Sequence, residues 1–254
     1  MERRRPSVLV FAGVDPSGGA GIAADILAIA AQGAHALPVI TALTVQDNDR
    51  VLGVEAVAPE LLRRQAQALI DKIAIHAVKI GIPGSAANAA VIARLIAQLR
   101  RAQPDLPVVL DPVLASGHGD VLSTGDAVQA LAPLLALTTL IVPNGPEAQA
   151  LGGVPRLRAH GCAHVLVTGG HGAGDTIINR WLDGDGSGRE WRWPRLPGAF
   201  HGSGCTLASA IAARLARGQP LAQALDLAQA YCHAALSGAY AIAPGQLMPQ
   251  RLTE

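Results

Sequence analysis

Short apolar runs alternate along this chain with segments in which apolar residues recur at helical spacing. Runs of strand length occupy residues 7–12, 38–43, 75–80, 107–110, 138–142 and 164–167. Between them, helical spacing over residues 21–31, 60–74 and 85–101 predicts helices with one apolar face. Because strands that alternate with helices are joined by crossover connections, the pattern predicts an α/β fold: a doubly wound, mostly parallel sheet with helices on both faces.

The remaining patterned segments are of two kinds. Residues 50–57 and 176–193 have the pattern of antiparallel strands, and the second segment turns through LDGDGSG at 182–188. Residues 205–217 and 221–239 predict two further helices. Since no linker, repeat or shift in composition divides the chain, we expect a single domain over residues 1–254.

Polar residues follow each apolar run of the predicted parallel sheet. In chain order they are Asp15, Thr44, Gln46, Lys79, Asp111, Asn144, Glu147 and residues 168–171. Loops are polar in most proteins, so any one of these residues could be an ordinary surface residue. Six polar loops in succession, however, meet at the carboxyl edge of a parallel sheet, where ligands bind. The pattern therefore predicts a ligand site at this edge.

The composition favours a small-molecule ligand. The chain carries 20 basic and 19 acidic residues and a net charge of +1, without the basic surface that nucleic acids or anionic membranes require. Its three cysteines, Cys162, Cys205 and Cys232, are odd in number and lack metal-ligand spacing, which argues against a disulfide framework or a zinc site. We expect a cytoplasmic protein with no nucleic-acid or membrane partner.

One glycine-rich stretch supports a competing function. Residues 19–24, GAGIAA, match the GxGxxA pattern that binds a dinucleotide between a strand and a helix. In dinucleotide-binding folds the first glycine follows the strand almost directly, whereas in this chain residues 13–18 intervene and lengthen the loop. A dinucleotide-dependent oxidoreductase therefore stays open as the weaker alternative. P-loop, HExxH, GxSxG and SxxK patterns do not occur, so the chemistries that they indicate are unsupported.

The segment HGSGCT, residues 201–206, combines a Gly-Ser-Gly turn with the start of a predicted helix. Such a turn presents unpaired backbone N–H groups at the positive end of the helix dipole, which suits a phosphate. We expect this environment to lower the pKa of Cys205, so that its thiolate could accept a proton from a substrate hydroxyl. Two alternatives stay open: a covalent nucleophile with His201 as its base, or a small residue in a packed helix.

Seven motifs together resemble one enzyme family. They are GVDPSGGAGIAADI, VITALTVQDN, VKIGI, VVLDPV, VPNGPEA, VTGGH and HGSGCTLASAIAA. In order and spacing, over residues 7–240, they resemble the hydroxymethylpyrimidine and phosphomethylpyrimidine kinases of thiamine biosynthesis, members of the ribokinase-like superfamily. The resemblance implies a single doubly wound domain, a homodimer, and transfer of the γ-phosphoryl group of ATP, with Mg²⁺, to a hydroxymethylpyrimidine and then to its monophosphate.

The resemblance also implies roles for individual residues. For the pyrimidine it implies contacts from Gly13, Ala20, Asp25, Gln46, Ile82 and Val113, and for ATP contacts from Asp111, Asn144, Thr168 and Gly170. It implies that Asn144 and Glu147 position the metal ion, although the same NxxE spacing is also typical of a helix capping box. It implies that Gly202, Ser203 and Gly204 form an anion hole and that Cys205 is the general base.

Two residues depart from the pattern of the family. Ile82 stands where the family usually has methionine, and Thr168 stands where it usually has lysine. The second change removes a cation from the phosphate site, and Arg180 and Arg195 are candidates to replace it. Two related functions therefore stay open: a pyridoxal or pyridoxine kinase of the same superfamily, and a catalytically silent protein that binds such a ligand.

Overall fold

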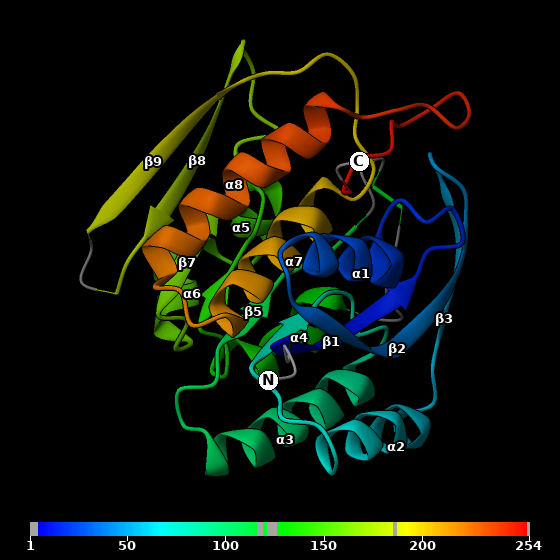
Figure 1. The fold of residues 1–254 in the computed structure, drawn as a ribbon, viewed down its shortest axis with the longest axis vertical. Coiled ribbons are helices and arrows are strands. Elements are labelled where there is room, and N and C mark those ends of the chain that lie inside the picture. The colour runs from blue at the N-terminus through cyan, green and yellow to red at the C-terminus, as the bar shows by residue number, and fades with distance from the viewer. Residues whose placement is uncertain (1–4, 116–118, 121–125, 185–186, 253–254) are drawn as a thin grey trace.

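A nine-stranded sheet runs through the molecule (Figure 1). The computed structural model describes residues 5–115, 119–120, 126–184 and 187–252. The strands are β1 Ser7–Val14, β2 His35–Gln46, β3 Val51–Ala56, β4 Ala77–Ile80, β5 Val108–Leu110, β6 Leu140–Ile141, β7 His164–Val167, β8 Thr176–Leu182 and β9 Gly188–Pro194. Their order is β3-β2-β1-β4-β5-β6-β7-β8-β9. The six strands from β2 to β7 in this order are parallel, whereas β3, β8 and β9 pair antiparallel at the edges.

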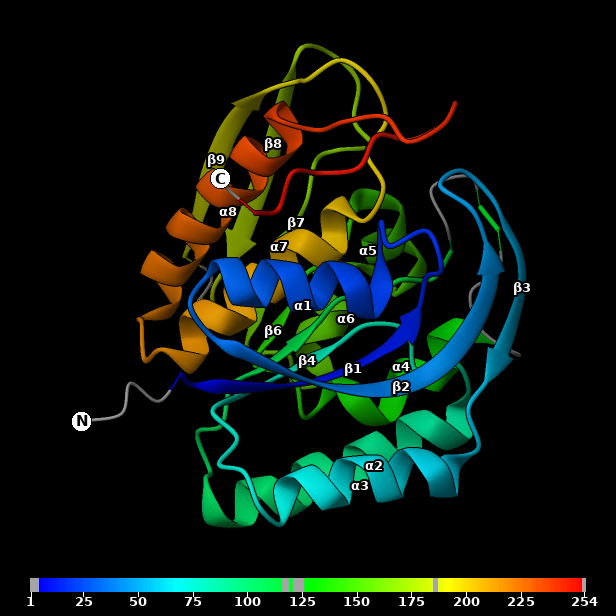
Figure 2. The ribbon, with the colours of Figure 1, turned by 45° about the vertical axis from the view of Figure 1, so that its right-hand side comes forward.

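Helices cover both faces of the sheet. They are α1 Gly21–Ala31, α2 Pro59–Ile70, α3 Ala86–Ala102, α4 Ala127–Leu135, α5 Gly145–Ala150, α6 Gly153–Ala159, α7 Ser203–Ala216 and α8 Leu221–Ser237. One apolar cluster joins the sheet to α2, α3 and α4, and another joins the opposite face to α1, α7 and α8 (Figure 2). Within the described ranges, none of the helices combines the length and apolar character needed to span a membrane.

The predicted architecture is confirmed, but several element boundaries differ. Strand β2 continues to Gln46 because its end pairs antiparallel with β3, a partner that an apolar run does not reveal. Strand β4 begins at Ala77 and β6 spans only two residues, because burial of apolar side chains extends beyond the ladder of hydrogen bonds. The predicted hairpin of β8 and β9 is present; its predicted turn at 182–188 includes residues 185–186, which lie outside the described residues.

The order of the strands places the site. From β1 the chain builds the parallel part of the sheet in two directions: β2 lies on one side of β1, and β4, β5, β6 and β7 follow on the other side. The order therefore reverses at β1 and β4. At such a reversal the connecting loops diverge and leave a crevice outside the carboxyl ends of the strands.

Helix α7 is the most deeply buried helix beside this crevice. Its side chains Ala208, Ala210, Ala212 and Ala213 have no exposed surface, and the helix contacts β1, β4 and β5 as well as α1 and α8. Small side chains allow this close approach, because a bulkier residue has no space between a helix and a sheet packed at crystal-like density. The alanine-rich sequence thus fixes where the first turn of α7 lies.

Replacement of a buried alanine of α7 tests this packing. We expect Ala210→Leu to lower the free energy of unfolding by about 1–3 kcal/mol, because the larger side chain overpacks the core. The matched control is Ala230→Leu in α8, where the residue is exposed. Urea denaturation followed by circular dichroism measures both, and equal midpoints for the two variants would contradict the close packing of α7.

Candidate active site

A cavity of about 540 Å³ opens at the carboxyl ends of the parallel strands. Residues from the ends of β1, β2, β4, β5, β6 and β7 line it, together with the start of α7. With one exception, every residue to which the resemblance assigns a role lines this cavity: Gly13, Ala20, Gln46, Ile82, Asp111, Val113, Asn144, Glu147, Thr168, Gly170, Gly202, Ser203, Gly204 and Cys205. The exception is Asp25. The predicted site at the carboxyl edge is therefore one continuous cavity.

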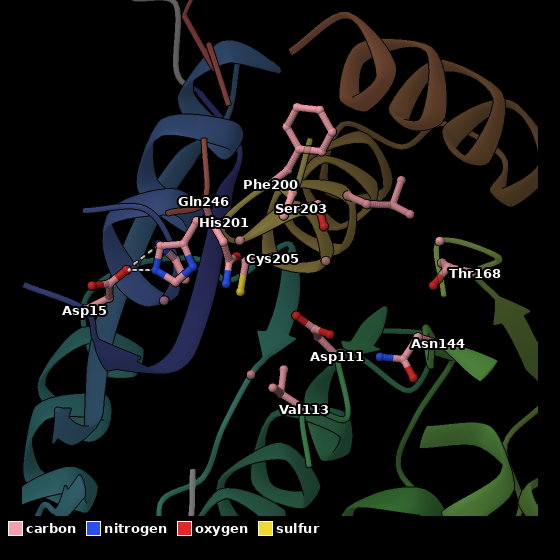
Figure 3. A pocket seen from close by; sticks show the side chains of 18 of the residues that line it. Asp15, Asp111, Val113, Asn144, Thr168, Phe200, His201, Ser203, Cys205 and Gln246 are labelled. Carbon is pink, nitrogen blue, oxygen red and sulfur yellow. Dashed lines mark hydrogen bonds and ion pairs between the residues drawn. The ribbon is translucent and has the colours of Figure 1, made fainter. Parts of the chain in front are cut away.

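The Gly-Ser-Gly turn forms one wall of the cavity (Figure 3). Gly202 is the N-cap of α7 and has a left-handed conformation with φ of 67°. A Cβ atom at this position would lie 2.1 Å from the carbonyl oxygen of Gly19, so both the conformation and the space require glycine. Because glycine has no side chain to cap the helix, no N-cap group competes with a ligand for the first amides of α7. The turn is therefore suited to bind an anion.

Cys205 lies in the first turn of α7, beside Asp111 (Figure 3). The prediction of a lowered pKa is wrong for the ligand-free protein: the surroundings raise the pKa of this thiol to about 12. Burial is the main cause; the carboxylates of Asp111 and Asp25 add to it, and the ammonium group of Lys79 opposes it. The helix dipole is outweighed, because a thiolate at this position would face two carboxylates and one ammonium group.

A buried cluster of charges lies behind Cys205. The Lys79 Nζ atom donates to both carboxylate oxygens of Asp25 at 2.8 and 3.0 Å, and it lies 3.9 Å from Oδ2 of Asp111. Ser209 donates to Asp25 at 2.7 Å. Burial alone would lower the pKa of Lys79, but the negative charge of Asp25, with Cys205 and Asp111, raises it. Lys79 is therefore a permanent ammonium ion under the site.

Asp25 belongs to this cluster and not to the cavity wall. It is fully buried, and its carboxylate is occupied by Lys79 and Ser209. The expectation that it contacts the pyrimidine is therefore not met in the structure. The sequence did contain a signal for its partner: Lys79 is a charged residue inside an apolar run, where a charge is rarely placed without a counter-charge.

Asp15 and His201 connect the loop before α1 to the Gly-Ser-Gly turn. The Asp15 carboxylate accepts hydrogen bonds from the amide of Ala20 at 2.7 Å, from the amide and hydroxyl of Ser17, and from Nε2 of His201 at 2.9 Å (Figure 3). Burial would raise its pKa, but hydrogen bonds from His201, Gln46 and Ser17 hold it well below its usual range. Asp15 is therefore ionised at neutral pH.

This arrangement weakens two alternatives from the sequence. Asp15 already occupies the amide of Ala20, the N-cap of α1, where a dinucleotide-binding helix would hold a pyrophosphate. His201 Nε2 is bonded to Asp15, so this nitrogen is not available to activate the sulfur of Cys205. The oxidoreductase therefore lacks a free amide for a pyrophosphate, and a nucleophilic Cys205 lacks Nε2 of His201 as its base.

The opposite end of the cavity contains Asn144, Glu147 and Thr168. Asn144 caps α5 and forms a complete capping box with Glu147: each accepts a hydrogen bond from the backbone amide of the other, at 2.9 and 2.8 Å. Burial, with the nearby charge of Asp111, raises the pKa of Glu147 to about 7. The NxxE spacing is thus a capping box whose members also line the cavity.

Of the two arginines considered as replacements for a lysine at Thr168, one lies at the cavity. Arg195 lines it and donates to the carbonyl oxygens of Gly170, Gly172 and Gly174 at 2.6 to 2.9 Å. Arg180 instead pairs with Glu190 on the neighbouring strand at 2.6 Å and does not belong to the described lining residues. The expectation for Arg180 is therefore not met.

Comparison with known proteins agrees with this geometry. The profile of the phosphomethylpyrimidine kinase family matches residues 15–249. This chain belongs to the phosphomethylpyrimidine kinase family. It is 37% identical to the hydroxymethylpyrimidine/phosphomethylpyrimidine kinase of Streptomyces coelicolor, over 94% of this chain and 92% of the relative. The resemblance inferred from the seven motifs is confirmed, and the chain is a member of a family of phosphotransferases.

Two solved structures show the same ribokinase-like fold. An ADP complex of pyridoxal kinase from Bacillus subtilis matches with a TM-score of 0.86 and 25% identity, over 97% of both chains. Phosphomethylpyrimidine kinase from Clostridium difficile 630 matches with a TM-score of 0.76 and 29% identity, over 92% of this chain and 100% of the other. The fold is thus common to kinases of both kinds of substrate.

Alkylation of Cys205 tests the raised pKa. Since only the thiolate reacts, we expect the rate with iodoacetamide in the ligand-free protein to rise about tenfold per pH unit from pH 7 to pH 10 without a plateau. Mass spectrometry of the modified peptide measures the rate, and Cys205→Ala identifies the site. A plateau below pH 8.5 would show an acidic thiol and would contradict the dominance of burial and the two carboxylates over the helix dipole.

Removal of the buried ammonium group tests the charge cluster. We expect Lys79→Met to lower the free energy of unfolding by about 3–5 kcal/mol, because Asp25 is left buried without a counter-charge. The double variant Lys79→Met/Asp25→Asn should recover part of the loss, since asparagine is neutral and still accepts from Ser209. Guanidinium denaturation measures both, and additive losses in the double variant would contradict the pairing.

Proposed function

We propose that this protein transfers the γ-phosphoryl group of ATP to 4-amino-5-hydroxymethyl-2-methylpyrimidine, and then to the resulting monophosphate, in thiamine biosynthesis. The observation that carries the proposal is the uncapped glycine turn 202–204 beside Cys205, at the switch point of a parallel sheet. Phosphoryl transfer requires mainly positioning and neutralisation of charge, and backbone amides at a helix N-terminus supply both.

The pyrimidine fits the side of the cavity formed by the ends of β1, β2 and β4. Gln46 offers both a donor and an acceptor, which an amino group beside a ring nitrogen requires. Ile82 packs against Gly13, where an added Cβ would lie 2.7 Å from its Cδ1 atom, so the two residues form one apolar wall. Val113 provides apolar lining from the end of β5, and Ala20 contributes backbone. These residues would hold the ring with its hydroxymethyl group toward Cys205.

ATP fits the other side of the cavity. Asn144, Thr168 and Gly170 line it, and Arg195 supplies the cation that Thr168 lacks. The residues present also fit Mg²⁺, because Oδ2 of Asp111 is a buried carboxylate oxygen with no hydrogen-bond partner among the described residues. Asn144 and Glu147 would act on the ion through water, as the resemblance to the family implies; their capping box occupies Oδ1 of Asn144 and Oε2 of Glu147. The ion would supply positive charge to the phosphates and offset the carboxylate field that raises the pKa of Cys205.

In the proposed mechanism, each part of the turn has one task. The amides of Ser203, Gly204 and Cys205 would stabilise the charge on the transferred phosphoryl group. Cys205 would accept the proton of the attacking alcohol. Because its pKa is about 12, the thiol would first release its own proton to solvent when the charges around it change on binding. The resulting thiolate would then accept the proton of the alcohol as the oxygen bonds to phosphorus and ADP leaves. Asp111 is held near the sulfur by the fixed charge of Lys79.

A pyridoxal or pyridoxine kinase is the second candidate. It is supported by the pyridoxal kinase of Bacillus subtilis, which has a higher TM-score than the phosphomethylpyrimidine kinase of Clostridium difficile. The sequence relation favours the pyrimidine: identity to the Streptomyces coelicolor kinase is 37%, against 25% to the pyridoxal kinase. Both substrates are aromatic alcohols of similar size, so only a direct comparison of turnover distinguishes them.

We further propose that the chain acts as one cytoplasmic domain, 1–254, and pairs as a homodimer. The absence of a disulfide among Cys162, Cys205 and Cys232 is compatible with a reducing compartment. Leu43, Val45 and Leu52 on β2 and β3 are exposed apolar side chains that a second copy could cover.

Release of ADP tests the function. With Mg²⁺ and ATP, we expect the hydroxymethylpyrimidine and its monophosphate to give turnover, and pyridoxine and pyridoxal to give a kcat/KM lower by at least about tenfold, because their rings lack the amino group that Gln46 would recognise. A coupled ADP assay measures all four. Preferred turnover of pyridoxal would support the second candidate, and no turnover of any alcohol would contradict both kinases and favour a silent binding protein.

Two cysteine variants locate the activity. Cys205→Ala should lower kcat by about 10²–10⁴, the usual contribution of a general base. Cys162→Ala is the control, because this buried cysteine donates to the carbonyl of Leu135 far from the cavity and should keep wild-type kcat. Full turnover by folded Cys205→Ala would rule out Cys205 as the base.

A further inference from the structure

Residues 246–251, which we call the strap, run beside the segment that enters the Gly-Ser-Gly turn, and Gln246 at its start lines the cavity. The amide of Leu247 donates to the carbonyl of Ala199 at 2.8 Å, and the amide of His201 donates to the carbonyl of Leu247 at 2.9 Å. Tyr240 and Met248 exchange both backbone hydrogen bonds. The strap is therefore held to the segment that enters the turn and to the chain beyond α8.

Arg251 places a buried guanidinium group behind the turn. The residue is 4% exposed, and its Nε atom donates to Oγ1 of Thr206 at 2.9 Å. Its Nη2 atom donates to the carbonyl of Gly19 and lies 3.3 and 3.5 Å from the carbonyls of His201 and Gly202. Within the described ranges, no carboxylate forms a salt bridge with it. Among the described residues, the guanidinium group is therefore surrounded by carbonyl oxygens and the Thr206 hydroxyl, with the carboxylate of Asp25 acting on it from beyond salt-bridge distance.

These contacts join two loops that are far apart in sequence. Gly19 precedes α1, whereas His201 and Gly202 precede α7, and one nitrogen of Arg251 is shared between them. Gly202 is also held by Thr206, whose hydroxyl donates to its carbonyl at 2.8 Å and accepts from Arg251. The orientation of the Gly202 peptide sets the direction of the amides that follow it. A shift there would move every proposed donor to the phosphoryl group.

We propose that Arg251 is a positioning residue for phosphoryl transfer, which fixes the Gly202 turn from behind and adds positive charge to it. The residue does not belong to the described lining of the cavity, so it acts through the turn and touches neither substrate. It also lies beyond the residues that the family profile matches, 15–249. This inference rests on the proposed function, because it assumes that the turn receives the phosphoryl group.

Two substitutions at Arg251 and one matched control test this role. Arg251→Met removes both the positive charge and the planar set of N–H donors of the guanidinium group, whereas Arg251→Lys keeps the charge without that set of donors. Arg214→Met is the control. Arg214 is in the last turn of α7 and donates to Gln32, which follows α1, at 2.7 Å, so it also ties α7 to the α1 region; it does not belong to the described lining of the cavity. The measurements are kcat, KM for each substrate, and the thermal shift with Mg²⁺ and ADP, with and without aluminium fluoride as a mimic of the transferred group.

We expect Arg251→Met to lower kcat by at least about tenfold with KM changed less than about twofold, because a small misplacement of the amides affects mainly the transition state. The extra thermal shift from aluminium fluoride should disappear while the shift from ADP alone stays. Arg251→Lys should recover part of kcat. Arg214→Met should lose thermal stability without loss of kcat, which separates a tie that only stabilises from one that positions the turn.

The contrary results are equally definite. Full kcat in folded Arg251→Met, or a decrease no larger than that of Arg214→Met, would overturn the proposal. If Arg251→Met does not fold, full kcat in Arg251→Lys would overturn it, since lysine cannot reach all the acceptors. If wild-type protein phosphorylates no alcohol, the proposed function fails, and the aluminium fluoride shift in wild type and variants still decides the role of Arg251. If wild-type protein shows neither turnover nor this thermal shift, both the proposed function and the role of Arg251 are overturned.

Discussion

The buried ion pair between Lys79 and Asp25 is the interaction on which the site depends. It joins β4 to α1 under the cavity, and Ser209 extends it to α7. Burial of an ion is costly, so the three elements must keep positions that let these groups satisfy one another. The same ammonium group lies 3.9 Å from Asp111, at the end of β5. The ammonium group of Lys79 thus fixes the relative positions of β4, α1 and α7, and it opposes the carboxylate charges that act on Cys205.

The position of the glycine turn follows from packing. Alanines without exposed surface let α7 lie directly on the sheet, so its first turn reaches the carboxyl ends of β1 and β4. At that point Gly202 passes so close to Gly19 that no side chain fits, and Asp15 and Arg251 hold the two loops together. Residues 202–205 line the cavity, and hydrogen bonds from Arg251 and Thr206 fix the carbonyl side of the turn. Preorganised donors of this kind need no rearrangement when charge develops on a ligand.

The electrostatics of the ligand-free site oppose ionisation of Cys205. Two carboxylates and burial outweigh one ammonium group and the helix dipole, so the thiol keeps its proton at neutral pH. Because only the thiolate is reactive, the raised pKa limits reaction of this thiol at neutral pH. At the other end of the cavity, the capping box of Asn144 and Glu147 fixes the start of α5, and both residues line the cavity.

The sequence by itself determined the alternating α/β fold, the edge where polar residues gather and the position of the glycine turn at the start of a helix, because hydrophobic period, strand ends and glycine conformation are local properties. It also predicted that most of the site residues share one cavity. Only the tertiary structure decided that Asp25 is buried under Lys79, that Cys205 is a protonated thiol and that Arg251 supports the turn. These facts depend on burial and charge between residues up to 232 positions apart. A lysine inside an apolar run indicates that a counter-charge exists, but no local pattern identifies the partner, because such interactions act through space.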